Sequence, residues 1–129
     1  MKHVSQPPGS SLCGQACVAM IANITLEESI AIFGKRGETE TRELIAVLRK
    51  LGISCGDKLI RMKKGIDPPP CCIMVLHFEG VPMRHWHWVV YHKGWYYDPA
   101  EGVAKGYVPS VRITSYLPIY VTESERMEP

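Results

Sequence analysis

One cysteine, one histidine and one aspartate could together make a thiol nucleophile in this chain of 129 residues. Cys13 stands where an apolar helical stripe begins, and the free N–H groups and dipole of a helix N-terminus favour a thiolate. A thiol nucleophile also needs a base within hydrogen-bond reach and a third group that orients this base. His87 and Asp98 are the candidates for these two positions. The predicted chemistry is attack of the Cys13 thiolate on a carbonyl group, through a thioester and without a cofactor.

The spacing of the histidine and the aspartate suits a β-hairpin. Side chains alternate between the two faces of a strand, so His87 shares a face with Val89 and Tyr91. Asp98 follows eleven residues after His87, beyond a turn predicted at Lys93-Gly94. A hairpin of this length can bring the carboxylate beside the imidazole, where it would fix the tautomer and stabilise the imidazolium.

Four further residues have possible roles in binding a substrate. Gln6 lies upstream of Cys13, and its side-chain amide could join the Cys13 backbone N–H as an oxyanion donor. One such donor is worth about 2.7–4 kcal/mol of transition-state stabilisation. Gly14 has no side chain that would block the sulfur. Trp86 could line a substrate groove, and His85 is expected at its rim.

Each candidate also has an ordinary structural explanation. Cys13 could be a small core residue, because free cysteines are often buried. His87 could be a half-buried histidine with satisfied hydrogen bonds. Asp98 precedes a proline, a common turn dipeptide, and Gln6 could be an exposed loop residue. The pattern alone leaves these explanations open.

A zinc site is the competing use of the histidines and cysteines in the second half of the chain. Zinc accepts both residue types as ligands. The chain has no Cys-x-x-Cys pair and no familiar zinc-ligand spacing, so we predict no metal site. Such a site would use His85, His87, Cys71 and Cys72 as ligands.

Three helices are predicted in the first half of the chain and strands in the second half. Helical spacing of apolar residues marks the helices, and short apolar or β-branched runs mark the strands. This order predicts one α+β domain over residues 1–129. The helices are residues 13–24, capped by Ser10 or Ser11; a helix with a Thr25/Glu28 capping box that ends at Gly34; and one from Thr39 or Thr41 to Gly52. The strands are residues 71–78, 85–92, 95–97 and 116–121, the last at a sheet edge because it contains Pro118.

Composition excludes several classes of protein. The net charge of +2 is too small to indicate nucleic-acid binding. No apolar run approaches the roughly 20 residues that span a bilayer, so no membrane association is predicted. The odd number of cysteines, five, argues against a disulfide framework, and no classical signal peptide is present. We therefore expect a cytoplasmic protein, with export by another route and the oligomeric state left open.

Three motifs in this order resemble one family. They are Gln…Cys-Gly-x-Ala-Cys-x-Ala-Met, then His-Trp-Val-Val-Tyr, then Tyr-Asp-Pro-Ala-x-Gly, over roughly residues 6–102. Together they resemble papain-like cysteine peptidases, most closely the bacterial bacteriocin-processing group that trims double-glycine leader peptides. The chain departs from the family at Leu12, where an aspartate is usual, and in the spacing of Gln6, which is one residue longer than usual.

The resemblance implies a papain-like fold with N-terminal helices packed on a C-terminal antiparallel sheet. It implies that Cys13 is the nucleophile, His87 the base, Asp98 the orienting residue and Gln6 an oxyanion donor. The expected function is a cysteine peptidase or amide hydrolase that acts on a peptide or protein. Two alternatives remain: an inactive papain-like module that binds peptides or proteins, and an acyltransferase or amidase with a non-peptide substrate.

Overall fold

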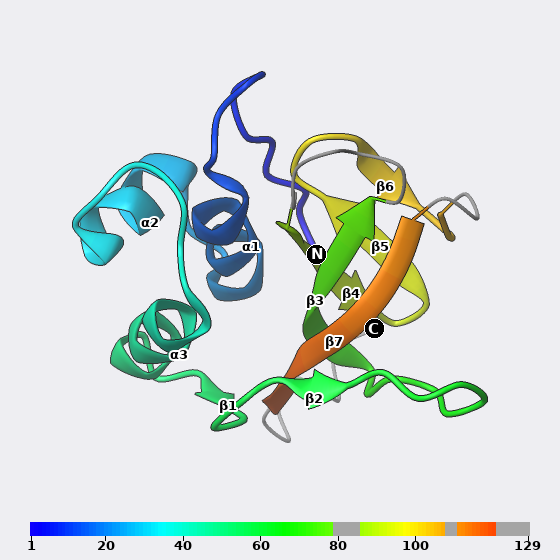
Figure 1. Ribbon diagram of the computed structural model, residues 1–129. Coiled ribbons are helices and arrows are strands. Elements are labelled where there is room, and N and C mark those ends of the chain that lie inside the picture. The colour runs from blue at the N-terminus through cyan, green and yellow to red at the C-terminus, as the bar shows by residue number, and fades with distance from the viewer. Residues whose placement is uncertain (79–85, 108–110, 121–129) are drawn as a thin grey trace.

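The described part of the chain combines three helices with an antiparallel sheet, and the helices come first. The computed structural model describes residues 1–78, 86–107 and 111–120. Figure 1 shows the three helices gathered on one side of the sheet, with α1 between the sheet and α2, and α3 next to β1. This arrangement confirms the α+β class.

The helices follow the predicted pattern with small differences at their ends. α2 (Leu26–Phe33) has the predicted capping box of Thr25 and Glu28 and ends at Gly34, which adopts the left-handed conformation. α3 (Thr41–Lys50) begins at the second of the two predicted threonines, with Glu40 at its N-cap.

α1 (Cys13–Ala22) differs from its prediction at both ends. It stops two residues early, because Asn23 adopts a left-handed conformation with φ of 56°. The prediction that Ser10 or Ser11 caps this helix is wrong. Leu12 occupies the N-cap position and has no side-chain oxygen with which to accept a hydrogen bond.

Within the described residues, the sheet contains three long strands and four short ones, all in antiparallel pairs. The strand order is β1-β7-β3-β4-β5-β6, and β2 also pairs with β7. The sequence pattern did not predict the two- and three-residue strands β1, β2 and β6. The strands are β1 (Ser54–Cys55), β2 (Ile60–Arg61), β3 (Cys71–Phe78), β4 (Trp86–His92), β5 (Trp95–Asp98), β6 (Gly102–Ala104) and β7 (Val111–Tyr120).

Pro118 does not mark an edge strand, contrary to the prediction. β7 is longer than predicted and pairs with β3 on one side and with β1 and β2 on the other. β2 pairs with residues 115 and 116 of β7, and β1 pairs with residues 119 and 120. Pro118 therefore lies where the partner of β7 changes from β2 to β1, and its missing N–H interrupts no continuous ladder there.

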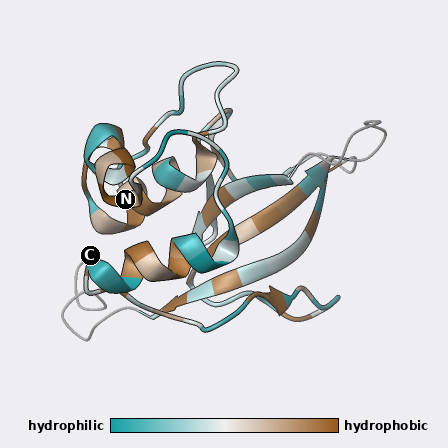
Figure 2. Cartoon of the chain, turned by 60° about the vertical axis from the view of Figure 1, so that its left-hand side comes forward, coloured by the Kyte–Doolittle hydropathy of each residue, from teal (hydrophilic) through white to brown (hydrophobic). Residues whose placement is uncertain are grey.

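The two faces of the sheet carry separate apolar clusters. On the face covered by the helices, Trp88 and Val90 of β4 pack with buried residues of α1 and α3. On the other face, Val89 packs with Met74 and a group of tyrosines. Figure 2 shows α3 with brown and teal residues, in keeping with a helix that presents an apolar face to this core. No single described helix is long and apolar enough to cross a bilayer; α1 and α2 pass that test only as a pair, bent by 112°.

Candidate active site

Cys13 is the first residue of α1, and its thiol differs in exposure from the other four. Its side chain is half-buried, whereas Cys17, Cys55, Cys71 and Cys72 are buried, and none of the five forms a disulfide. The first N–H groups of a helix have no acceptor within the helix. Because Leu12 has no side chain that can accept a hydrogen bond, the first N–H groups of α1, next to Cys13, are not capped. This helix end can therefore stabilise negative charge on the sulfur or on a bound oxygen.

His87 lies on β4, close to both candidate partners. β4 and β5 pair only from Val90↔Tyr97 to the turn, so His87 lies three residues beyond the last pair, where the strands diverge. Its Nε2 is 2.6 Å from Oδ1 of Asp98, and the side chain of Cys13 lies near enough to contribute to the raised pKa of His87. Since Nε2 contacts the carboxylate, Nδ1 is the ring nitrogen left for the thiol. The imidazole is 12% exposed.

Asp98 is almost completely buried, with 2% of its side chain exposed, and its carboxylate accepts several hydrogen bonds. Oδ1 accepts from His87 and from the backbone N–H groups of Ala100 (2.8 Å) and Glu101 (3.3 Å), and Oδ2 accepts from the hydroxyl of Tyr107 (2.9 Å). The bond to Ala100 is an Asx-turn. The turn-forming role of Asp98 and its role beside His87 are therefore compatible.

The N-terminal segment supports the backbone on either side of this carboxylate. Nε2 of His3 donates to the carbonyl oxygen of Asp98 at 2.7 Å. The backbone N–H of Gln6 donates to the carbonyl oxygen of Pro99 at 2.9 Å. These bonds tie the first residues of the chain to the end of β5.

The contacts shift the protonation of His87 and Asp98 in opposite directions. Burial of the His87 ring disfavours the imidazolium, but hydrogen bonds to Asp98 and Cys13 and their charges outweigh burial and raise the pKa of His87 to about 9. Burial of the Asp98 carboxyl favours its neutral form. The hydrogen bond and charge of His87, with help from Ala100 and Tyr107, nevertheless hold the pKa of Asp98 below its ordinary value. Both directions favour an imidazolium–carboxylate pair.

Three of the buried thiols resist ionisation. Burial is the main cause in each: it raises the pKa of Cys17, raises that of Cys55 and raises that of Cys72 to about 12. The negative charges of Cys13 and Asp98 add to the effect at Cys17. These thiols stay protonated and enclosed at neutral pH, so they react slowly with an alkylating agent.

Gly14 lies beneath a loop rather than beside an open approach to the sulfur. It is buried, and a Cβ built on it would meet Oγ1 of Thr39 at 2.0 Å and Cβ of Thr39 at 3.1 Å. The predicted reason for this glycine, free access to the sulfur, is replaced by close packing of Thr39 on the first turn of α1. The side-chain amide of Gln15 donates to the carbonyl oxygens of Lys35 and Gly37 and holds the same loop.

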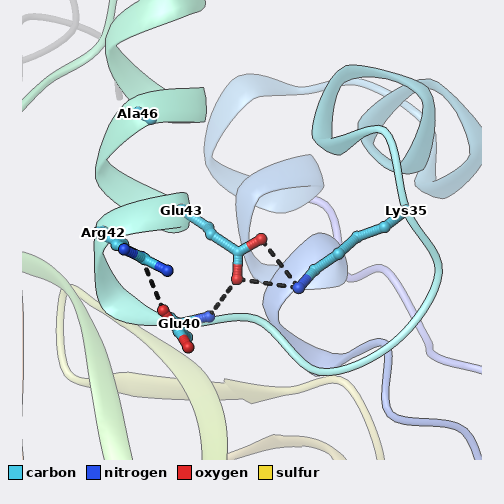
Figure 3. Close-up of a pocket in the computed structure, with 5 residues that line it drawn as sticks. All are labelled: Lys35, Glu40, Arg42, Glu43 and Ala46. Carbon is cyan, nitrogen blue, oxygen red and sulfur yellow. Dashed lines mark hydrogen bonds and ion pairs between the residues drawn. The ribbon is translucent and has the colours of Figure 1, made fainter.

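A cavity of about 500 Å³ lies between this loop and α3 (Figure 3). Charged side chains line it, and they pair with one another: Lys35 with Glu43 at 2.9 Å and Arg42 with Glu40 at 2.8 Å. Glu43 also accepts from the backbone N–H of Glu40. None of Cys13, His87 and Asp98 lines the cavity. The Lys35–Glu43 pair joins the loop that packs on Gly14 to α3.

The amide of Gln6 is engaged within its own loop. Its Nε2 donates to the carbonyl oxygen of Ser10 at 2.7 Å and lies 3.4 Å from the hydroxyl oxygen of the same residue. Its Oε1 is buried and has no hydrogen-bond partner among the described residues. To act as an oxyanion donor, Gln6 would offer the N–H that does not bind the Ser10 carbonyl.

Of the two residues predicted to border the substrate, Trp86 lies within the described chain and His85 lies outside it. Trp86 is 54% exposed and packs on the ring of His77, with the ring centres 4.8 Å apart. It is the neighbour of His87 on β4, so side-chain alternation directs it to the opposite face of that strand.

The sequence pattern did not identify Tyr107, His3 or Thr39 as contributors to this site. Tyr107 lies nine residues after Asp98, His3 lies near the start of the chain, and the pattern around Thr39 predicts only a helix cap. His3 and Thr39 act through contacts between distant segments, and Tyr107 acts through the packing of a loop; no regular spacing in a single sequence encodes such contacts.

Comparisons with known proteins do not assign the chain to a family. No protein-family model matches the sequence, and a search of curated proteins finds no similar one. Within the described residues, no group of three or more histidine, cysteine, aspartate or glutamate side chains is arranged to hold a metal ion. The site is therefore interpreted from its own geometry.

Proposed function

We propose that the protein is a thiol hydrolase of papain-like type that cleaves a peptide or amide bond. One observation carries this proposal: His87 bonds to the buried carboxylate of Asp98 at 2.6 Å and lies near enough to Cys13, at an uncapped helix N-terminus, for that side chain to raise its pKa. A histidine that only packs in the core needs no thiol at a helix end as a partner. A histidine that acts as the base for a thiol nucleophile does need one. The helix-first order and the antiparallel sheet are compatible with the papain-like fold.

The proposed reaction begins with proton transfer from Cys13 to His87. The thiolate attacks the carbonyl carbon of the substrate, and the backbone N–H of Cys13 together with the second N–H of Gln6 stabilises the resulting oxyanion. The imidazolium then protonates the leaving amine as the C–N bond breaks, which leaves an acyl thioester on Cys13. A water molecule, deprotonated by His87, hydrolyses the thioester, and the thiol is restored. Asp98 stays ionised and holds the imidazole in position.

A substrate screen with trapping of the intermediate tests this proposal. The protein is incubated with a peptide library prepared from a bacterial proteome, and new peptide ends are identified by mass spectrometry. The reaction is also quenched with acid, so that an acyl group on Cys13 can be found by intact mass. Cys13→Ala is the control, since it removes only the sulfur from a half-buried site.

We expect new peptide ends and an acyl adduct with the wild-type protein and neither with Cys13→Ala. Saturable peptide binding without cleavage would instead support a binding module. An adduct formed from small acyl donors, with no peptide cleaved, would support an acyltransferase or amidase.

A further inference from the structure

The carboxylate of Asp98 has donors on both of its oxygens, and they come from different parts of the chain. His87 and two backbone N–H groups donate hydrogen bonds to Oδ1. Among the described residues, Tyr107 provides the one hydrogen bond to Oδ2, at 2.9 Å. A carboxyl group turns easily about its last side-chain torsion, so one donor on each oxygen is needed to fix its plane.

The ring of Tyr107 is itself held by a row of aromatic residues. It packs edge-to-face on Tyr96, with the ring centres 5.2 Å apart, and Tyr96 packs in the same manner on Tyr91 at 5.1 Å. This row lies on the face of the sheet opposite the helices, with Met74 and Val89. The hydroxyl is therefore aimed at Asp98 by packing that is independent of the hydrogen bond.

We propose that Tyr107 is a positioning residue for the triad: its hydroxyl keeps the Asp98 carboxylate ionised and turned toward His87. The proposal rests on the function proposed above. A buried carboxylate without enough donors favours its neutral form, because burial penalises charge. A protonated Asp98 would no longer stabilise the imidazolium of His87, and the reactive form of Cys13 would be lost with it.

The surrounding groups are consistent with this role. The titratable groups near the carboxylate are His87 on β4, Cys17 on α1 and Tyr107, and His3 contacts the backbone carbonyl of Asp98. Burial, the charge of Asp98 and the hydrogen bond to it raise the pKa of Tyr107. Tyr107 thus remains a protonated donor at every pH at which the site would function.

The test compares the pH dependence of Cys13 alkylation by iodoacetamide in four proteins. They are the wild type, His87→Ala, Tyr107→Phe and Tyr91→Phe. Tyr107→Phe keeps the aromatic row and removes the hydroxyl. Tyr91→Phe is the matched control, because it removes a hydroxyl from the same row that is not a donor to Asp98. Carbon-13 NMR of the Asp98 carboxyl group in Tyr107→Phe provides a second readout.

We expect Tyr107→Phe to raise the pKa of Asp98. We also expect it to move the acid limb of the alkylation profile, the pH range in which Cys13 alkylation sets in, to higher pH. The proton affinity of the Asp98 carboxylate should rise about 10- to 100-fold, which is the factor for the loss of one hydrogen bond to a charged group. Tyr91→Phe should match the wild type. If Tyr107→Phe does not fold, 3-fluorotyrosine at position 107 retains the hydroxyl as a more acidic donor and should move the limb to lower pH.

Different outcomes would overturn the two proposals. A wild-type profile and an unchanged Asp98 titration in Tyr107→Phe would overturn the role of Tyr107 and leave the hydrolase intact, provided that His87→Ala loses reactivity. Equal alkylation of the wild type and His87→Ala would overturn the hydrolase itself. An unchanged profile with 3-fluorotyrosine would likewise count against Tyr107.

Discussion

Replacing Asp98 by asparagine should lower the pKa of His87 sharply, because it removes the charge beside the ring and leaves the side-chain shape almost unchanged. The contacts of the folded protein raise that pKa from 6.5 to about 9. A rise of this size corresponds to about 3 kcal/mol in favour of the imidazolium. Two side chains raise the pKa of His87, and Asp98 has a larger effect than Cys13, whereas burial lowers it. In Asp98→Asn we therefore expect the pKa of His87 to fall toward its ordinary value.

The lower pKa of His87 in Asp98→Asn should also alter how the stability of the protein depends on pH. A group whose pKa is raised by folding stabilises the protein fully below its unfolded-state pKa, and this contribution is lost as pH rises through the folded-state value. For His87 the window runs from 6.5 to about 9. Across that window, the loss of the His87 contribution should lower the free energy of unfolding of the wild type by up to about 3 kcal/mol. Asp98→Asn should lose most of this pH dependence.

Two measurements check the prediction. Nitrogen-15 NMR of the histidine rings follows the titration of His87 directly in both proteins. Urea unfolding at pH values across the window gives the dependence of stability on pH. A pKa for His87 that stays near 9 in Asp98→Asn would refute the reasoning, since another group would then be holding the proton.

Three further predictions concern the same site. Gly14→Ala should destabilise the protein by about 1–3 kcal/mol in urea unfolding, because the new methyl group collides with Thr39, and adding Thr39→Ala should recover part of the loss; no recovery would exclude this contact as the cause. Gln6→Ala should lower kcat about 100-fold on the substrate found by the screen and leave the alkylation rate of Cys13 unchanged, and a kcat close to that of the wild type would exclude an oxyanion role. The value of kcat/KM should fall as pH rises through about 9, where His87 loses the proton that it gives to the leaving amine, and a flat alkaline limb would contradict this assignment.

Local signals in the sequence were enough to predict most of the elements. The Thr25/Glu28 capping box, Gly34 and the helical stripes depend on residues within one or two turns, and the structure confirms them. The turn at Lys93-Gly94 and the side-chain alternation of β4 likewise predicted that Val89 and Trp88 face opposite sides. These features together bring His87 and Asp98 to one place.

Features that depend on contacts between distant segments could not be predicted. Pro118 suggested an edge strand, but the changing partners of β7 accommodate it inside the sheet. Ser10 and Ser11 looked like helix caps, yet α1 begins after Leu12. Tyr107 and Thr39 reach the site only through loop packing, which leaves no periodic pattern in the sequence.

The central claim, a thiolate–imidazolium pair between Cys13 and His87, is tested most directly by alkylation of Cys13. The rate of reaction with iodoacetamide is measured against pH for the wild type and His87→Ala, with mass spectrometry separating Cys13 from the four buried cysteines. The account predicts that Cys13 in the wild type reacts well below neutral pH and loses this reactivity in His87→Ala. A Cys13 that titrates like an ordinary thiol, or that reacts equally in both proteins, would contradict it.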